Sequence, residues 1–275
     1  MRPQDRQTMN RIFPLLVEAA PFRGVLLREF RAALINRYFQ IFAAFSLLGG
    51  LSAIVFSEDA NAPGFFILQL ALYLVSLFSL LAGVSSAQAE REEWQLMFSQ
   101  PVPRTVYVIG KFISYLSIFA AVLALLFLPA TLSASTPGRI GILYCQTLLL
   151  VAAFLALGLA AGFFAHDRAQ ALIAGVSAWL LLLFGLDLIA LLAARWEFVQ
   201  NIPDLWISLL MLNPLDAFRI NALFALEQIP AEAANKTPLA SWWIAHAGIW
   251  FGAIATIWSA ALIALSGFRL HRWEE

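Results

Sequence analysis

Charged residues are scarce in this sequence. Only 12% of its 275 residues are Asp, Glu, Lys or Arg, whereas 61% are apolar. Soluble domains typically carry about 25% charged and roughly 45–50% apolar residues. The composition therefore excludes an ordinary soluble enzyme and favours a membrane protein.

The sequence also lacks a net charge and has a single cysteine. Its 17 basic side chains balance its 17 acidic ones, so there is no basic surplus for nucleic acid, and no nucleic-acid partner is expected. The lone Cys145 can form no disulfide within the chain. We expect its thiol to act as a small apolar side chain in the protein interior.

Long charge-free windows supply the membrane segments. The windows are 38–57, 60–89, 112–138, 140–166, 169–186 and 237–268. Because a bilayer core about 30 Å thick needs roughly 20 apolar residues of helix, the windows can hold six spans. The sequence thus predicts an all-α polytopic membrane protein with transmembrane helices at 38–56, 64–84, 112–131, 141–164, 171–194 and 247–267.

The distribution of basic residues predicts the orientation of these spans. With the N-terminus inside, 13 of the 17 Lys and Arg residues fall on the cytoplasmic side and four fall outside. The positive-inside rule therefore favours both termini in the cytoplasm. Because the first apolar run lacks the short basic lead-in of a cleaved signal peptide, we expect this span to be retained.

This orientation divides the chain into three parts. Residues 1–37 form a cytoplasmic N-terminus, residues 38–267 form one six-span transmembrane domain, and residues 268–275 form a cytoplasmic tail. In the first part, 21–37 has the pattern of an amphipathic helix that lies in the headgroup layer. Its expected apolar side carries Leu26, Leu27, Phe30, Ala33 and Leu34, and its expected solvated side carries Arg23, Arg28, Glu29, Arg31 and Arg37. A fully solvated cytoplasmic helix is the alternative.

The loop between the second and third spans, 85–103, is dense in charged and amphipathic residues. Its sequence, SSAQAEREEWQLMFSQPVP, predicts a short helix that must end before Pro101, because proline cannot continue a helix. Such a helix can dock on a soluble partner through its three acids, Glu90, Glu92 and Glu93, and its apolar side chains Trp94, Met97 and Phe98. A solvated acidic loop explains the same residues about equally well.

The predicted external loop 195–246 is too long and too apolar for a linker. Its central part has a helical pattern that the Asn213-Pro214 pair interrupts, and each side is too short to span. Such segments are interfacial or re-entrant. In the preceding span, Asp187 is the one intramembrane acid, which suggests a functional role by default, although its proximity to Arg195 favours a structural ion pair.

Recognisable catalytic and metal-binding patterns are absent. The sequence has no G-x-S-x-G, H-E-x-x-H or Walker-type motif, and His166, His246 and His271 lie in three separate segments. The methionines and Cys145 form no series of soft ligands along a pathway. We therefore expect no catalytic, metal-binding or cofactor-binding residue in this chain. The small residues of 152–162 are instead typical of closely packed membrane helices.

Together these features resemble the permease subunits of ABC transporters of the ABC-2 type. The stretch EREEWQLMFSQPVPRTVYVIGK, residues 90–111, is similar to the segment with which this family couples to its ATPase, and LNPLDAFR, residues 212–219, resembles an external motif of one branch. That branch serves maturation of nitrous oxide reductase. The resemblance runs over nearly the whole chain.

The resemblance implies a homodimer in the inner membrane, on a dimer of cytoplasmic ATPase subunits that hold ATP and magnesium, with a periplasmic partner outside. The implied ATPase-coupling residues are Glu90, Arg91, Glu92, Glu93, Trp94, Met97 and Phe98, with a second contact at His166, Asp167 and Arg168. The implied periplasmic contacts are Asn213, Pro214, Asp216 and Arg219. In that branch, the complex would assist copper-sulfur centre assembly by exporting a sulfur species or by mechanical work on the periplasmic partner.

Three other interpretations stay open at this point. Six spans can form three-plus-three inverted repeats of a secondary transporter, although the halves show no evident similarity. A membrane-embedded enzyme is a second alternative, which the missing catalytic constellation weakens. Within the family, the chain can also belong to an exporter of an unrelated substrate.

Overall fold

The computed structural model describes residues 24, 26–32, 34–35, 37–55, 62–89, 104–133, 137–193, 195–197, 201, 208, 210–226 and 238–271, and within these ranges the chain is helical with no strand. The helices are α2 (Arg37–Val55), α3 (Ala62–Leu70), α4 (Ser76–Ala89), α6 (Arg104–Ser133), α7 (Pro137–Phe164), α8 (Arg168–Leu180), α9 (Leu186–Ala193), α12 (Pro214–Ala225) and α13 (Pro238–His271). Two π-helical turns, η1 (Ala71–Val75) and η3 (Leu181–Gly185), join α3 to α4 and α8 to α9.

Five of these helices are long and apolar enough to cross a membrane. They cover Gly64–Ala89, Arg104–Leu132, Pro137–Phe164, Arg168–Ala193 and Ala245–His271. Five of the predicted spans fall on these helices, which makes the chain a multi-pass membrane protein. The first predicted span, 38–56, coincides with α2, whose apolar part Phe39–Val55 is shorter. The third span starts earlier than predicted, because Lys111 lies inside α6 rather than before it.

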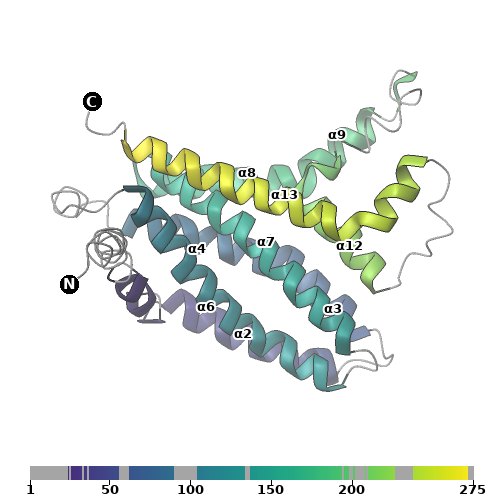
Figure 1. The fold of residues 1–275 in the computed structure, drawn as a ribbon, viewed down its shortest axis with the longest axis horizontal. Helices are drawn as coiled ribbons and strands as arrows, with labels where there is room; N and C mark the ends of the chain where they lie inside the picture. The colour runs from purple at the N-terminus through teal and green to yellow at the C-terminus, as the bar shows by residue number, and fades with distance from the viewer. Residues whose placement is uncertain are drawn as a thin grey trace, which may run out of the picture.

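Helix α7 is the centre of the bundle (Figure 1). It packs against α4, α6, α8, α12 and α13, and almost three quarters of its apolar window is buried. Helix α2 packs along α6 on one side, and α13 packs along α7 on another. The α8–η3–α9 helix is largely exposed, and α9 diverges from the other helices.

Glycines allow α4 and α7 to approach at backbone distance. A Cβ atom at Gly158 would overlap the carbonyl oxygen of Leu80, and one at Gly83 would overlap the carbonyl oxygen of Leu155. Small residues at such positions allow membrane helices to gain van der Waals contact along their backbones. The predicted packing role of 152–162 is thus confirmed.

The prediction that Cys145 lies in the interior is wrong. Its side chain is exposed on α7, on the same helical face as Gly141 and Ile142. Composition suggested burial because free cysteine is usually a core residue. The packing partners of α7 cover its other faces, so this one is left open at the end of the helix nearest Pro137.

Side chains supplement the backbone hydrogen bonds at both π-helical turns. Ser76 Oγ donates to the carbonyl oxygen of Leu72 in η1 (2.5 Å), and Trp179 Nε1 donates to the same Ser76 Oγ (2.9 Å). Asn213 Nδ2 donates to the carbonyl oxygen of Leu182 in η3 (2.6 Å). Since a π turn disturbs the regular hydrogen-bond ladder, these donors stabilise the two irregular places.

Replacement of Gly158 tests the α4–α7 contact. Gly158→Ala is expected to destabilise the protein by about 1–3 kcal/mol, because the added methyl group meets backbone that cannot rotate away. Gly141→Ala is the control on the same helix, where a Cβ atom has no neighbour within 4 Å. Thermal unfolding of the purified protein in detergent measures both; equal melting temperatures for the two variants would contradict the proposed contact.

Candidate functional site

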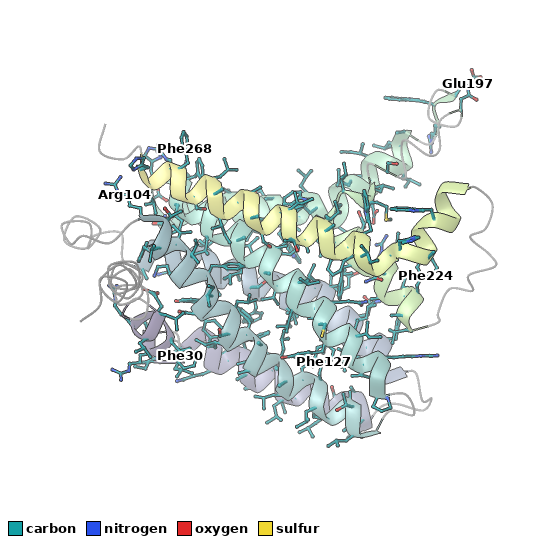
Figure 2. All side chains as sticks on the ribbon, in the orientation of Figure 1. Phe30, Arg104, Phe127, Glu197, Phe224 and Phe268 are labelled. Atoms are coloured by element: carbon teal, nitrogen blue, oxygen red, sulfur yellow. The ribbon has the colours of Figure 1, made fainter. Side chains whose placement is uncertain are left out.

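Four helix termini meet at one end of the bundle, which we call the Arg104 end. Arg104 Nη1 donates to the carbonyl oxygens of Leu270 (2.6 Å) and His271 (3.0 Å), which joins the start of α6 to the end of α13. Gln88 Nε2 donates to the carbonyl oxygen of Gly162 (2.6 Å) and joins the end of α4 to that of α7. Figure 2 shows Arg104 and Phe268 together at this end and Phe224 and Glu197 at the other. The predicted inner ends of these four helices therefore do meet.

The principal predicted coupling residues, from Glu90 to Phe98, lie outside the described residues. The structure describes the two positions that flank their loop, Ala89 at the end of α4 and Arg104 at the start of α6. Both belong to the Arg104 end. The segment between them consequently starts and ends at this face of the bundle, while the roles of its acids and aromatic residues stay predictions.

The second predicted contact, 166–168, is a sharp exposed turn between α7 and α8. Asp167 is the N-cap of α8, and its Oδ1 accepts a hydrogen bond from the Gln170 backbone N–H (2.7 Å). Gln170 Oε1 in turn accepts from the His166 backbone N–H (2.7 Å). This reciprocal arrangement satisfies two otherwise free donors at the helix start. The side chains of His166, Asp167 and Arg168 are all exposed, so the turn is accessible to a soluble partner.

The prediction that Glu29 is solvated is wrong. Its side chain is 1% exposed, and its Oε2 accepts a hydrogen bond from Lys111 Nζ on α6 (2.7 Å). Lys111 is equally buried, and its ammonium lies 5.2 Å from the centre of the Tyr107 ring. The helical pattern assigned Glu29 to the solvated side of the segment together with the arginines. The sequence did not reveal its partner Lys111, because the two residues are 82 positions apart. The side of the segment that faces the bundle instead carries Leu26, Glu29 and Phe30, whereas Leu27 and Leu34 are exposed.

At the opposite end, Asn213 attaches α12 to the neighbouring span. It is the N-cap of α12, with Oδ1 accepting from the Leu215 backbone N–H (3.1 Å). Its Nδ2 donates to Leu182 in η3 and to Asp216 Oδ2 (2.6 Å). Asn213, Pro214 and Asp216 are all buried, so among the four predicted periplasmic contacts Arg219 is the accessible one.

Asp187 forms an ion pair, but with a different partner from the one suggested by sequence proximity. Arg219 Nη1 lies 3.3 Å from Asp187 Oδ2, and Arg219 Nη2 lies 3.6 Å from Asp216 Oδ1. One guanidinium thus serves two carboxylates from two helices. The spacing between Asp187 and Arg195 suggested a local pair, whereas α12 folds back and brings Arg219 into reach.

Asp216 lies on α12, outside the five candidate spans, and has an unusual proton affinity. Burial raises the pKa of this carboxyl from its ordinary 3.8 to about 6. The hydrogen bond from Asn213 lowers the pKa, the charge of Asp187 raises it, and that of Arg219 lowers it. The loss of hydration is the largest of these effects.

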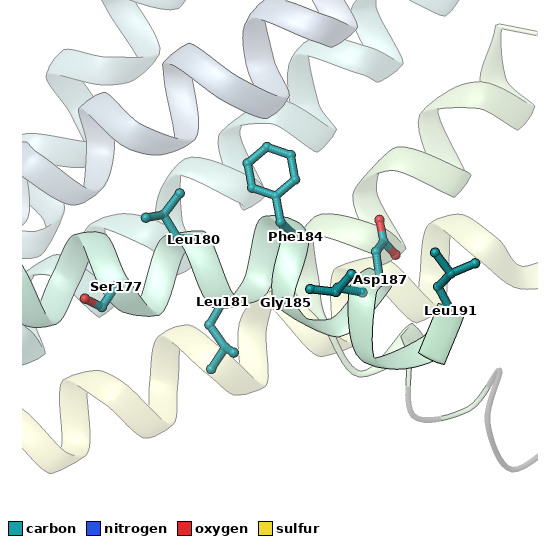
Figure 3. A pocket seen from close by; sticks show the side chains of 8 residues that line it. Ser177, Leu180, Leu181, Phe184, Gly185, Asp187 and Leu191 are labelled. Carbon is teal, nitrogen blue, oxygen red and sulfur yellow. The ribbon is translucent and has the colours of Figure 1, made fainter. Parts of the chain in front are cut away.

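A groove of about 670 Å³ runs along the α8–η3–α9 helix next to this cluster (Figure 3). Asp187 is the one ionisable side chain that lines it. Apart from Ser177, the remaining lining is apolar or glycine: Leu180, Leu181, Phe184, Gly185, Leu188 and Leu191. The groove therefore offers a hydrophobic strip with a carboxylate near one end.

Comparison with known proteins identifies the family. No protein-family model matches the sequence. A curated relative, the probable ABC transporter permease protein NosY of Pseudomonas aeruginosa, is 31% identical over 212 residues, which cover 72% of this chain and 75% of the relative. The chain belongs to the ABC transporter permease family. The resemblance inferred from residues 90–111 and 212–219 is confirmed at this level.

Membership decides among the broad alternatives left open by the sequence. An ABC permease is a membrane subunit rather than an enzyme or a secondary transporter, and it implies a partner ATPase. The described part of the permease contains no group of three or more His, Cys, Asp or Glu side chains that could hold a metal ion.

The raised pKa of Asp216 predicts a pH-dependent stability. The folded permease binds this proton more tightly than the unfolded chain, so the contribution of Asp216 is fully present below about pH 4 and is lost as the pH rises through about 6. Asp216→Asn keeps an acceptor for Asn213 and removes the titration. The melting temperature of the parent minus that of the variant should fall across this range; a constant difference would refute the assignment.

Proposed function

We propose that this chain is the transmembrane permease subunit of an ABC transporter that couples ATP hydrolysis by a separate cytoplasmic ATPase to export or to mechanical work on a periplasmic partner. The observation that carries the proposal is the 31% sequence identity with the probable permease NosY over three quarters of that protein's length. ATP and magnesium would then be bound by the ATPase, and this chain would need no cofactor of its own.

The geometry of the Arg104 end supports a coupling role for this face. The exposed turn 166–168 and both flanks of segment 90–103 belong to it. A soluble subunit docked here would reach α4 and α6 through one segment and α7 and α8 through the other. Movement of the ATPase would in this way act on four helices at once.

We further propose six spans with both termini in the cytoplasm. Helix α2 has 19 residues, which is within the range of roughly 17–25 that crosses a bilayer. It packs along α6. With α2 included, the Arg104 end faces the cytoplasm, in keeping with the excess of Lys and Arg predicted for that side, and α12 lies on the periplasmic side of the inner membrane.

A homodimer is supported by the exposed charges beside the groove. Asp187 and Arg219 are each 41% exposed, and Asp187 lies in a helix that crosses the membrane. Ionisable groups in a bilayer are costly unless they face protein or water. A second copy against the α8–η3–α9 helix, or an aqueous pathway between two copies, would cover them.

We assign the complex to copper-sulfur centre assembly of nitrous oxide reductase, with a NosF-like ATPase and a NosD-like periplasmic protein as partners. The assignment rests on the resemblance of residues 212–219 to that branch and on the relative named NosY. A sequence without a series of thiols and methionines fits export of a sulfur species, or mechanical work, better than copper transport.

Charge reversal tests the coupling segment. Replacing Glu90, Glu92 and Glu93 together by Lys is expected to weaken docking of the ATPase, because their carboxylates would face its surface. Copurification from membranes that contain normal levels of the permease measures docking. The matched control reverses three acids of the predicted external region, Glu197, Glu227 and Glu232. Undiminished copurification of the first variant would remove the assignment.

Site-specific crosslinking tests the periplasmic contact. Leu212 precedes the buried Asn213 and is 48% exposed, so a cysteine there, in a Cys145→Ala background, leaves the Asn213 hydrogen bonds intact. We expect crosslinks from this position to a periplasmic protein. A cysteine at Ile113, near the Arg104 end, is the control and should give none. Adducts with lipid alone at Leu212 would contradict the proposed contact.

A further inference from the structure

The pairing of Glu29 with Lys111 is the most deeply buried charge contact among the described residues. Both side chains are 1% exposed, and their charged atoms are 2.7 Å apart. Removing two ions from water is costly, and the cost is offset only when they are paired with good geometry. Each charge is therefore stabilised by the other, and Arg28 Nη2 also lies 4.0 Å from Glu29 Oε1.

A second contact fixes the same two elements one turn away. Ser114 Oγ lies within hydrogen-bond distance of the carbonyl oxygen of Leu26 (3.1 Å) as well as that of Gly110 in its own helix (2.8 Å). Phe30 packs against the hydrophobic core from the same segment. The helical residues 26–32 are thus held to α6 at two successive levels, so they cannot turn about a single point.

The attachment lies close to where the coupling segment enters the membrane domain. Lys111 is two turns after Arg104, the first residue of α6, and the helix between them is unbroken. Arg104 is itself bonded to the end of α13. A force on segment 90–103 therefore reaches Lys111 through a short stretch of rigid helix.

We infer that the Glu29–Lys111 pair joins the N-terminal helical segment to the start of α6, so that both move as one unit when the ATPase acts on the coupling segment. The inference rests on the proposed function. Glu29 and Lys111 are positioning residues in this arrangement, since neither needs to touch the ATPase or a transported molecule. Movement at the coupling segment would be carried to the residues that precede the first span.

Spin-label distances in the complete permease–ATPase complex in lipid nanodiscs test this joint. Labels at Leu27 and Leu128 report the N-terminal segment against α6, and labels at Leu27 and Ile173 report it against α8; all three positions are exposed. Cys145 is first replaced by Ala, and labelled subunits are diluted with unlabelled ones. In the parent, we expect a narrow distribution of Leu27–Leu128 distances that ATP does not change. The Leu27–Ile173 distance, in contrast, should change with ATP.

Single substitutions and an exchange of the charges separate the joint from general stability. Glu29→Gln and Lys111→Gln are each expected to broaden the distribution of Leu27–Leu128 distances and to make this distance respond to ATP. The exchange Glu29→Lys with Lys111→Glu restores a pair of opposite charges and is expected to narrow the distribution again. The control Arg31→Gln changes an exposed charge on the same segment and should have no effect. If the single variants fail to fold, Glu29→Met with Lys111→Met removes both charges of the pair and should still broaden the Leu27–Leu128 distance distribution.

Two results would overturn the inference. One is a parent Leu27–Leu128 distance that changes with ATP as much as the Leu27–Ile173 distance does. The other is a Leu27–Leu128 distance distribution that stays as narrow as in the parent when Glu29, Lys111 or both are replaced by Gln or Met. A parent complex in which ATP changes neither distance, or from which the ATPase does not copurify, would instead contradict the proposed function and remove this inference with it.

Discussion

Polar groups inside a bilayer must find their partners within the protein, and this requirement organises the permease. Several hydroxyl groups along the spans donate to the carbonyl oxygen one turn earlier in the same helix. Thr147, Thr256, Ser259 and Ser266 all do so. Such bonds satisfy the hydroxyl without a partner helix. Polar groups that bond between helices are consequently the ones that fix the arrangement of the bundle.

Most of these interhelical bonds lie at the two ends of the bundle and at the π-helical turns, and one more joins Tyr144 on α7 to the carbonyl oxygen of Ala120 midway along α6. Arg104 and Lys111 fix α6 at one end, and Asn213 fixes α12 at the other. Trp179 and Ser76 join the second predicted span to the fifth beside η1. Between these places the contact is mainly apolar, and it includes the ring pairs of Phe39 with Tyr115 and Phe119. A few interhelical hydrogen bonds and ion pairs thus fix the arrangement of the helices, and apolar packing stabilises the contacts between them.

Hydropathy was sufficient to find five helices that are long and apolar enough to span, because a run of about 20 apolar residues is a property of a local window. It misplaced the start of the third span, since a window ends at a charge whether or not that charge is paired. The ion-pair partners of Glu29 and Asp187 could not be found from the sequence for a related reason. Their partners, Lys111 and Arg219, are far away in sequence, and only the folded chain brings them together.

The candidate site was predictable in kind but less so in detail. The sequence predicts that the Asn213-Pro214 pair interrupts a helical pattern, and the structure shows that α12 begins at this pair with Asn213 as its cap. The same pattern could not show that Asn213 and Asp216 are buried against η3, because burial depends on how α12 folds back. The capping interaction between Asp167 and Gln170 is local, so the sequence alone indicates it through an acid three residues before a glutamine. From the sequence, 166–168 is predicted only as a contact surface, not as this cap.

The glycine contact between α4 and α7 has a consequence for how such a subunit can change shape. Two helices whose backbones touch cannot slide or rotate past each other unless they first separate, so α4 and α7 move as one rigid unit. The lightly packed α8–η3–α9 helix has no such restraint along most of its length, and its widened turn lies midway. A rearrangement within the membrane is therefore easiest for the α8–η3–α9 helix, which can move relative to the rigid α4–α7 pair.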